Sequence, residues 1–117
     1  MKTIFIFGLL ISATHAFARE AVCFDSSNSD YQITLNLDTQ GLLTTIAYSN
    51  IDWGSAGMGE PQTVKNVGPN IYQVVTPPQS RLGLQRDAKV ELRLDRSSIL
   101  QEVLISKSGS EATFRCN

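Results

Sequence analysis

The chain has 117 residues, a formal charge of −1 at pH 7, two cysteines and a single histidine. This length corresponds to one small domain. Charges of both signs are interspersed, which excludes the basic footprint of a nucleic-acid-binding protein and the polybasic patch of a membrane-surface protein. No glycine-rich phosphate motif follows a strand and opens a helix, so no nucleotide cofactor is expected.

The first eighteen residues have the pattern of a secretory signal peptide. Lys2 gives a positive start, residues 4–11 form a short apolar core, and residues 16–18 place alanine at the two positions that a signal peptidase reads. A membrane span needs about 20 apolar residues, so this run is too short for an anchor. We expect cleavage after Ala18 and an exported domain, residues 19–117, without a membrane anchor and located in the periplasm or outside the cell.

The expected mature chain lacks the usual catalytic groups. His15 leaves with the signal peptide, and the remaining 99 residues carry nine basic and eleven acidic side chains, a formal charge of −2. Cys23 and Cys116 stand near the two ends of the domain, and such a pair in an exported protein predicts a disulfide rather than two free thiols. Without histidine or a free thiolate, we expect no enzyme, no metal site and no cofactor.

The first half of the domain alternates between apolar and polar residues. Residues 21–25 predict a short strand, residues 26–30 a polar turn, and residues 31–38 a second strand whose alternation is unbroken. Gly41 suits the left-handed position of a bulged hairpin turn, and residues 42–49 return as the partner strand.

Residues 50–69 have no sustained period and are expected to form a long connection. They hold four glycines, two prolines and the only tryptophan, and long loops in small domains are often functional. Trp53 and Met58 stand among the glycines, and both residue types are enriched at binding interfaces. The alternative is that Trp53 folds back and caps an open end of the fold, because a lone tryptophan is usually well buried.

The second half returns to strands. Residues 71–76 predict a strand that ends at Pro77-Pro78, since proline donates no ladder hydrogen bond. Residues 81–86 predict a weaker strand, residues 88–107 a hairpin with one apolar and one charged face, and residues 111–116 the last strand. The carboxylates of the hairpin lie on its charged face, which is typical of solvated side chains rather than of a glycosidase pair.

About eight short strands, short connections and no amphipathic helix predict an all-β antiparallel domain. A small closed barrel is favoured because it removes exposed edges; a two-sheet β-sandwich is the alternative and uses the same strands. A barrel would bring the first and last strands together and let Cys23 and Cys116 join its seam.

Three function classes fit such a domain. The first is a binding protein whose long loop contacts another protein. The second is a carrier of a small hydrophobic ligand inside the barrel, although at this size the interior is expected to be filled by side chains. The third is a structural component of the cell envelope. A carrier cavity would be ringed by inward residues, such as Tyr31, Leu35, Leu92 and Phe114.

The signal peptide, the terminal cysteines and the small barrel resemble the MliC/PliC-type inhibitors of C-type lysozyme, in which a Ser-Gly-x-x-Tyr loop enters the lysozyme cleft. This chain has no faithful copy of that motif: residues 54–57 read Gly-Ser-Ala-Gly and the next tyrosine is Tyr72, while residues 107–112 loosely resemble a second family segment. The resemblance implies inhibition of a lysozyme-like enzyme. The candidate binding residues are Trp53, Ser55, Met58 and Tyr72.

Overall fold

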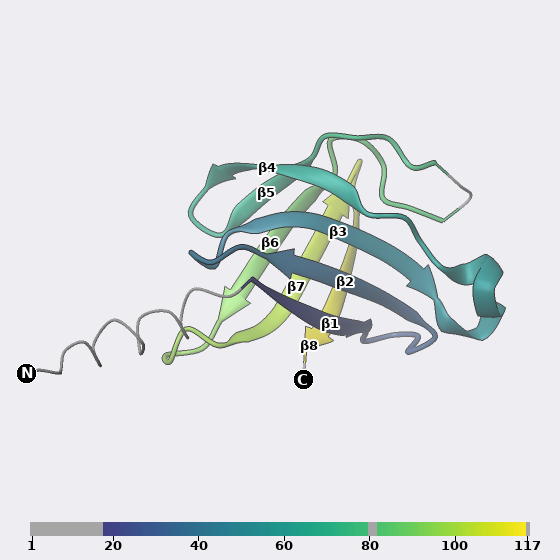
Figure 1. Cartoon of the computed structure of the whole chain (residues 1–117), viewed down its shortest axis with the longest axis horizontal. Coiled ribbons are helices and arrows are strands. Elements are labelled where there is room, and N and C mark those ends of the chain that lie inside the picture. Colours follow the sequence, from purple (N-terminus) through teal and green to yellow (C-terminus); the bar gives the residue numbers. More distant parts are fainter. Residues whose placement is uncertain (1–17, 80–81, 117) are drawn as a thin grey trace, which may run out of the picture.

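The alternating segments of the chain become the strands of a closed antiparallel β-barrel, which confirms the barrel rather than the sandwich (Figure 1). The computed structural model describes residues 18–79 and 82–116, so the predicted signal peptide lies, apart from Ala18, outside the described residues. The eight strands follow one another around the barrel in chain order. They are β1 (Arg19–Asp25), β2 (Tyr31–Leu37), β3 (Leu43–Asn50), β4 (Gln62–Gly68), β5 (Ile71–Val74), β6 (Lys89–Leu94), β7 (Leu100–Lys107) and β8 (Ser110–Cys116).

Two of the predicted elements are wrong, and their errors cancel in the strand count. The connection expected over residues 50–69 contains a 3₁₀ segment, η1 (Ile51–Gly57), and then the whole of β4. The strand expected over residues 81–86 does not form where the structure describes it, at residues 82–86. Leu82 and Leu84 are buried there, so their alternation reflects packing rather than pairing in a ladder.

The middle of the barrel is filled by side chains. Inward residues of β2 follow the predicted alternation, with Ile33 and Leu35 fully buried. Phe114 of β8 is 1% exposed and Val103 of β7 is fully buried, so strands from opposite parts of the wall meet in one core. Such a core holds its side chains at close to crystalline density.

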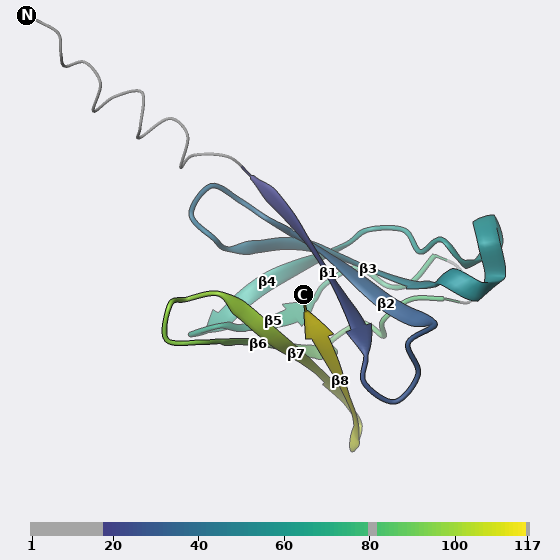
Figure 2. The same cartoon turned by 90° about the horizontal axis from the view of Figure 1, so that it is seen from below.

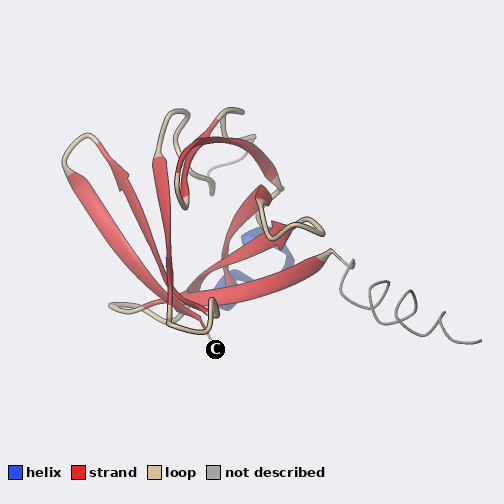
Figure 3. Cartoon of the chain, turned by 90° about the vertical axis from the view of Figure 1, so that its left-hand side faces the viewer, coloured by secondary structure: helices blue, strands red, loops and turns tan. Residues whose placement is uncertain are grey.

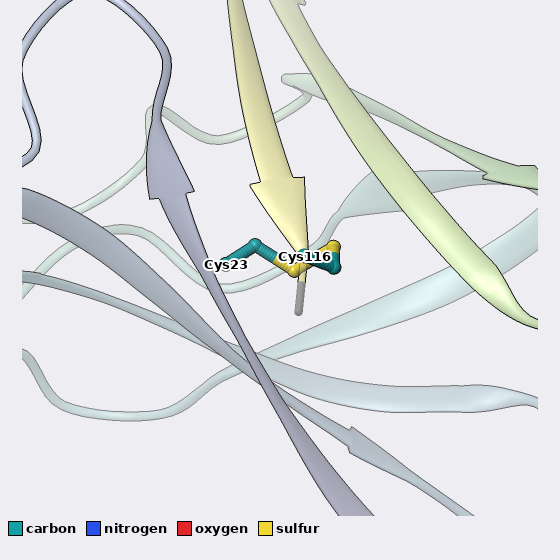
Figure 4. The surroundings of a disulfide bond; sticks show 2 residues. All are labelled: Cys23 and Cys116. Carbon is teal, nitrogen blue, oxygen red and sulfur yellow. A yellow bond between two sulfur atoms is a disulfide. The ribbon is translucent and has the colours of Figure 1, made fainter.

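The barrel closes through the predicted disulfide. Cys23 and Cys116 face each other in the register of β1 and β8, and their sulfur atoms are bonded (Figure 4). Figure 2 shows β1 and β8 meeting near the end of β8. Only three residue pairs join these two strands, whereas six join β1 to β2 and six join β7 to β8. The covalent bond therefore secures one of the narrowest seams of the barrel.

The connections alternate between the two ends of the barrel. The β2–β3, β4–β5 and β6–β7 turns lie at what we call the hairpin end, which faces the viewer in Figure 3. The β1–β2 turn, η1 and the long β5–β6 connection lie at the other end, which we call the η1 end. The two long connections, residues 51–61 and 75–88, are thus both at the η1 end.

Candidate functional site

The connection between β3 and β4 projects from the η1 end of the barrel. In Figure 1, η1 stands at the right-hand extreme, outside the strands. Ile51, Trp53 and Met58 are 52%, 48% and 69% exposed, although each has a large apolar side chain. The three exposed apolar residues lie within eight residues of one another, in η1 or directly after it. We call these three residues the η1 patch.

The backbone that carries the η1 patch is held to the barrel by hydrogen bonds. Asn50 caps the start of η1, where its Oδ1 accepts from the Asp52 N–H at 2.9 Å. The Ile51 N–H donates to the Asp30 carbonyl oxygen in the β1–β2 turn at 2.8 Å. A backbone held in this way loses less conformational entropy on binding than a free loop, so the start of the segment is pre-organised.

Two glycines let this segment pack directly on the end of β3. A Cβ on Gly57 would collide with the backbone oxygen of Asn50, and a Cβ on Gly59 would collide with the backbone oxygen of Tyr48. The Gly59 N–H also donates to Ser49 Oγ at 2.9 Å. These two glycines therefore serve close packing, which lets a glycine-rich stretch lie directly against the barrel.

Three of the four candidate binding residues lie together in this projection. Trp53 and Ser55 are in η1, Met58 directly follows it, and all three are exposed. The exposure of Trp53 argues against the alternative in which it caps the barrel. Sequence reasoning missed Ile51, because an isoleucine beside a strand is more often a core residue.

Tyr72 does not belong to this surface. It lies in β5, it is 2% exposed, and its hydroxyl oxygen accepts a hydrogen bond from the Leu43 N–H at 3.1 Å. Strand alternation turns the ring into the core, together with Val74 two residues later. Its assignment to the binding loop is therefore wrong; Tyr72 is a core residue of the hairpin end.

Carboxylates stand on both sides of the η1 patch in the sequence. Between Arg19 and Lys65 the sequence contains six carboxylates and no basic side chain. Among these carboxylates Asp30, Asp52 and Glu60 are exposed at the η1 end, and none forms an ion pair with a described residue. A surface of this sign attracts a basic partner, and its association rate falls as salt increases.

An aromatic cluster lies inside the η1 end. The Tyr31 and Tyr48 rings stack with centroids 5.5 Å apart, and Tyr48 meets Phe114 edge to face at 6.2 Å. Burial raises the pKa of Tyr48 from 10.0 to about 12, and the nearby Tyr31 and Asp25 add to the shift. The phenol is therefore kept neutral well into alkaline solution.

The raised pKa of Tyr48 predicts a loss of stability in alkali. In the unfolded chain Tyr48 releases its proton near 10.0, whereas the folded barrel retains it to about 12, so the free energy of unfolding should fall as pH rises through this window. Urea unfolding midpoints across the window should show the decline. Tyr48→Phe keeps the ring and should decline less steeply; equal slopes for the two proteins would contradict the assignment.

A cavity lies at the hairpin end of the barrel. It has a volume of about 730 Å³ and is lined by residues that include Leu37, Leu92 and Leu100. Among the residues expected to ring a carrier cavity, Leu35 is packed in the core, Leu92 lines this cavity, and Phe114 lines another of about 360 Å³ at the η1 end. Leu92 and Phe114 thus line different cavities at opposite ends of the barrel.

Together, the fold and its surface define a small disulfide-closed β-barrel with an exposed apolar projection at one end. Comparisons of the chain with known protein families, with curated proteins and with solved structures find no match. No helix within residues 18–79 and 82–116 is long and apolar enough to cross a membrane. The same residues contain no cluster of three histidine, cysteine or carboxylate side chains that could hold a metal ion.

Proposed function

We propose that this barrel is an exported protein that binds another protein through the η1 patch. The observation that carries the proposal is the exposure of Ile51, Trp53 and Met58 on a backbone held by hydrogen bonds. Tryptophan and methionine are enriched at protein interfaces, and a pre-organised segment keeps more of its contact energy as affinity. The disulfide is consistent with an exported compartment.

The proposed partner is a lysozyme-like enzyme, and the proposed outcome is inhibition. The resemblance to lysozyme inhibitors implies this partner. An apolar projection with exposed carboxylates beside it suits a cleft whose rim is basic. A binding role also agrees with a sequence that has no histidine after His15 and with two cysteines joined in a disulfide. The carrier and envelope-component alternatives make no use of the exposed patch.

Replacement of Trp53 should test the patch. Trp53→Ala should weaken binding of a C-type lysozyme at least about thirtyfold, because truncation of a hot-spot tryptophan typically costs about 2 kcal/mol or more. The measurements are calorimetric titration of the enzyme and inhibition of its cell-wall lysis. Ile99→Ala is the matched control, since Ile99 is 57% exposed at the hairpin end and should leave binding unchanged.

The outcomes distinguish a wrong partner from a wrong binding site. If the wild-type protein neither binds nor inhibits C-type lysozyme, that enzyme is not the partner. Capture from envelope and secreted fractions then tests the patch, with wild type, Trp53→Ala and Ile99→Ala as baits. Equal capture of a partner by all three baits would show that the η1 patch is not the binding site.

A further inference from the structure

The hairpin end of the barrel opens into a cavity with leucine walls. This cavity of about 730 Å³ is lined by residues of the β2–β3, β4–β5 and β6–β7 turns and of the strands beside them. Leu37, Leu92 and Leu100 are buried along it, whereas Leu42 and Leu94 are 44% and 40% exposed. Small-molecule sites have volumes of about 300–1,000 Å³, are mostly apolar and occur in the mouths of β-barrels.

A second cavity extends this space along the wall of the barrel. It has a volume of about 430 Å³ and shares Arg19, Leu37 and Leu100 with the first. It lies at the narrow seam, where β8 pairs with β1 only from Cys23 onward and residues 19–22 have no partner in β8. The two cavities adjoin at these shared residues, and their leucine side chains offer an apolar surface against which an aliphatic chain can lie.

One cation stands where the two cavities meet. Arg19 lines both cavities, it is the only charged residue that lines the larger one, and it forms no ion pair with a described residue. Glu20 lines the smaller cavity, and Asp38 and Asp95 lie in the adjoining turns. Oδ1 of each aspartate already accepts two backbone N–H groups of its own turn. A guanidinium without a partner beside an apolar space favours an anionic group.

We propose that the hairpin end binds a single-chain amphiphilic anion, with its aliphatic chain against the leucines and its headgroup at Arg19. Carboxylate and phosphate headgroups share this chemistry, so a fatty acid and an alkyl phosphate are two sources of the same ligand. This site and the η1 patch lie at opposite ends of the barrel. The proposal is therefore independent of protein binding by the η1 patch.

The proposal can be tested by titrating the exported protein with dodecanoate, dodecyl phosphate and dodecyltrimethylammonium below their micelle concentrations. Leucine methyl signals report the hairpin end, and the Trp53 indole signal reports the η1 end. At least one of the two anions should shift the signals of Leu37, Leu92 and Leu100 and leave the Trp53 signal unchanged, whereas the cation should not. The anion that binds more tightly identifies the headgroup. If neither anion shifts these leucines, the site does not exist.

Two substitutions locate the chain and the headgroup. Leu94→Asp should weaken anion binding about tenfold, because it removes apolar contact and adds a like charge. Val75→Asp is the matched control at the η1 end, since Val75 is also 40% exposed; equal binding by these two variants would overturn the site.

Arg19→Gln should weaken anion binding about fivefold and reduce the preference for anion over cation. An unchanged preference would overturn the headgroup assignment.

Discussion

Removal of the Cys23–Cys116 disulfide should lower the free energy of unfolding by about 4 to 5 kcal/mol. The bond joins residues 93 positions apart, and the chain-entropy estimate for a loop of about 100 residues is about 4.7 kcal/mol. Only three residue pairs join β1 to β8, so little else holds this seam. Domains of this size are stable by about 5–15 kcal/mol, so the loss is a large share of the total.

Guanidinium unfolding of Cys23→Ala/Cys116→Ala, followed by far-ultraviolet circular dichroism, measures this loss. Trp53 is nearly half exposed, so its fluorescence would report unfolding poorly. The dependence on denaturant should steepen, because a chain without the cross-link exposes more surface when it unfolds. Reduced wild-type protein controls for the packing lost with the buried Cys23 side chain. Equal midpoints for oxidised and reduced wild type would contradict the prediction.

Gln62→Ala should lower the free energy of unfolding by about 3 kcal/mol, an unusually large effect for a polar residue. Gln62 is 3% exposed, and its Nε2 donates to the carbonyl oxygens of Thr76 at 2.9 Å and Leu84 at 2.8 Å. Its Oε1 accepts from the Leu84 N–H at 2.9 Å. The alanine variant removes all three bonds and leaves backbone groups buried without partners, which costs more than the bonds themselves contribute.

Gln101→Ala is the control for Gln62→Ala. Gln101 is exposed on β7, and its side chain makes one long hydrogen bond, 3.3 Å, to Asp95. Its replacement should change the free energy of unfolding by no more than about 0.5 kcal/mol. Hydrogen exchange at the Leu84 amide should accelerate in Gln62→Ala and stay unchanged in Gln101→Ala. Equal unfolding midpoints for the two variants would show that Gln62 does not fasten the β5–β6 connection.

The Gln62 bonds also matter for the η1 end. Gln62 is the first residue of β4, directly after the connection that carries the η1 patch, and it ties that point to the connection over residues 75–88. Only two residue pairs join β3 to β4, so hydrogen bonds from one side chain supplement a short ladder. The two long connections of the η1 end are thus held to the barrel at a shared point.

The sequence by itself determined the strands that have one face in the core and one in water. β2 is the clearest case, because Ile33, Leu35 and Leu37 alternate with polar residues and only one strand register buries all three. The disulfide was also predictable, since a barrel brings its first and last strands together and Cys23 and Cys116 stand in those strands.

β4 could not be predicted by alternation. Its fully buried residue is Gln62, a polar side chain, while Val67 is 53% exposed, so the apolar pattern of a strand is missing. The opposite error arose at Leu82 and Leu84, which alternate and are buried but lie outside the strands. In both places burial was decided by contacts between the β5–β6 connection and the start of β4. These two segments lie far apart in the sequence, so a local pattern cannot show the contacts.

Only the tertiary structure decided which aromatic side chain is available to a partner. Trp53 and Tyr72 are both candidate binding residues in the sequence, but hydrogen bonds donated by the Ile51 and Asp52 N–H groups hold the start of η1 in place, whereas strand alternation turns Tyr72 inward. The first cavity at the hairpin end likewise depends on where three turns meet near Arg19, and the second depends on where β8 ends. The local sequence determines which residues alternate between the two faces of a strand. Exposure and cavities depend on contacts between segments that are distant in the sequence, and a local pattern contains no information on those contacts.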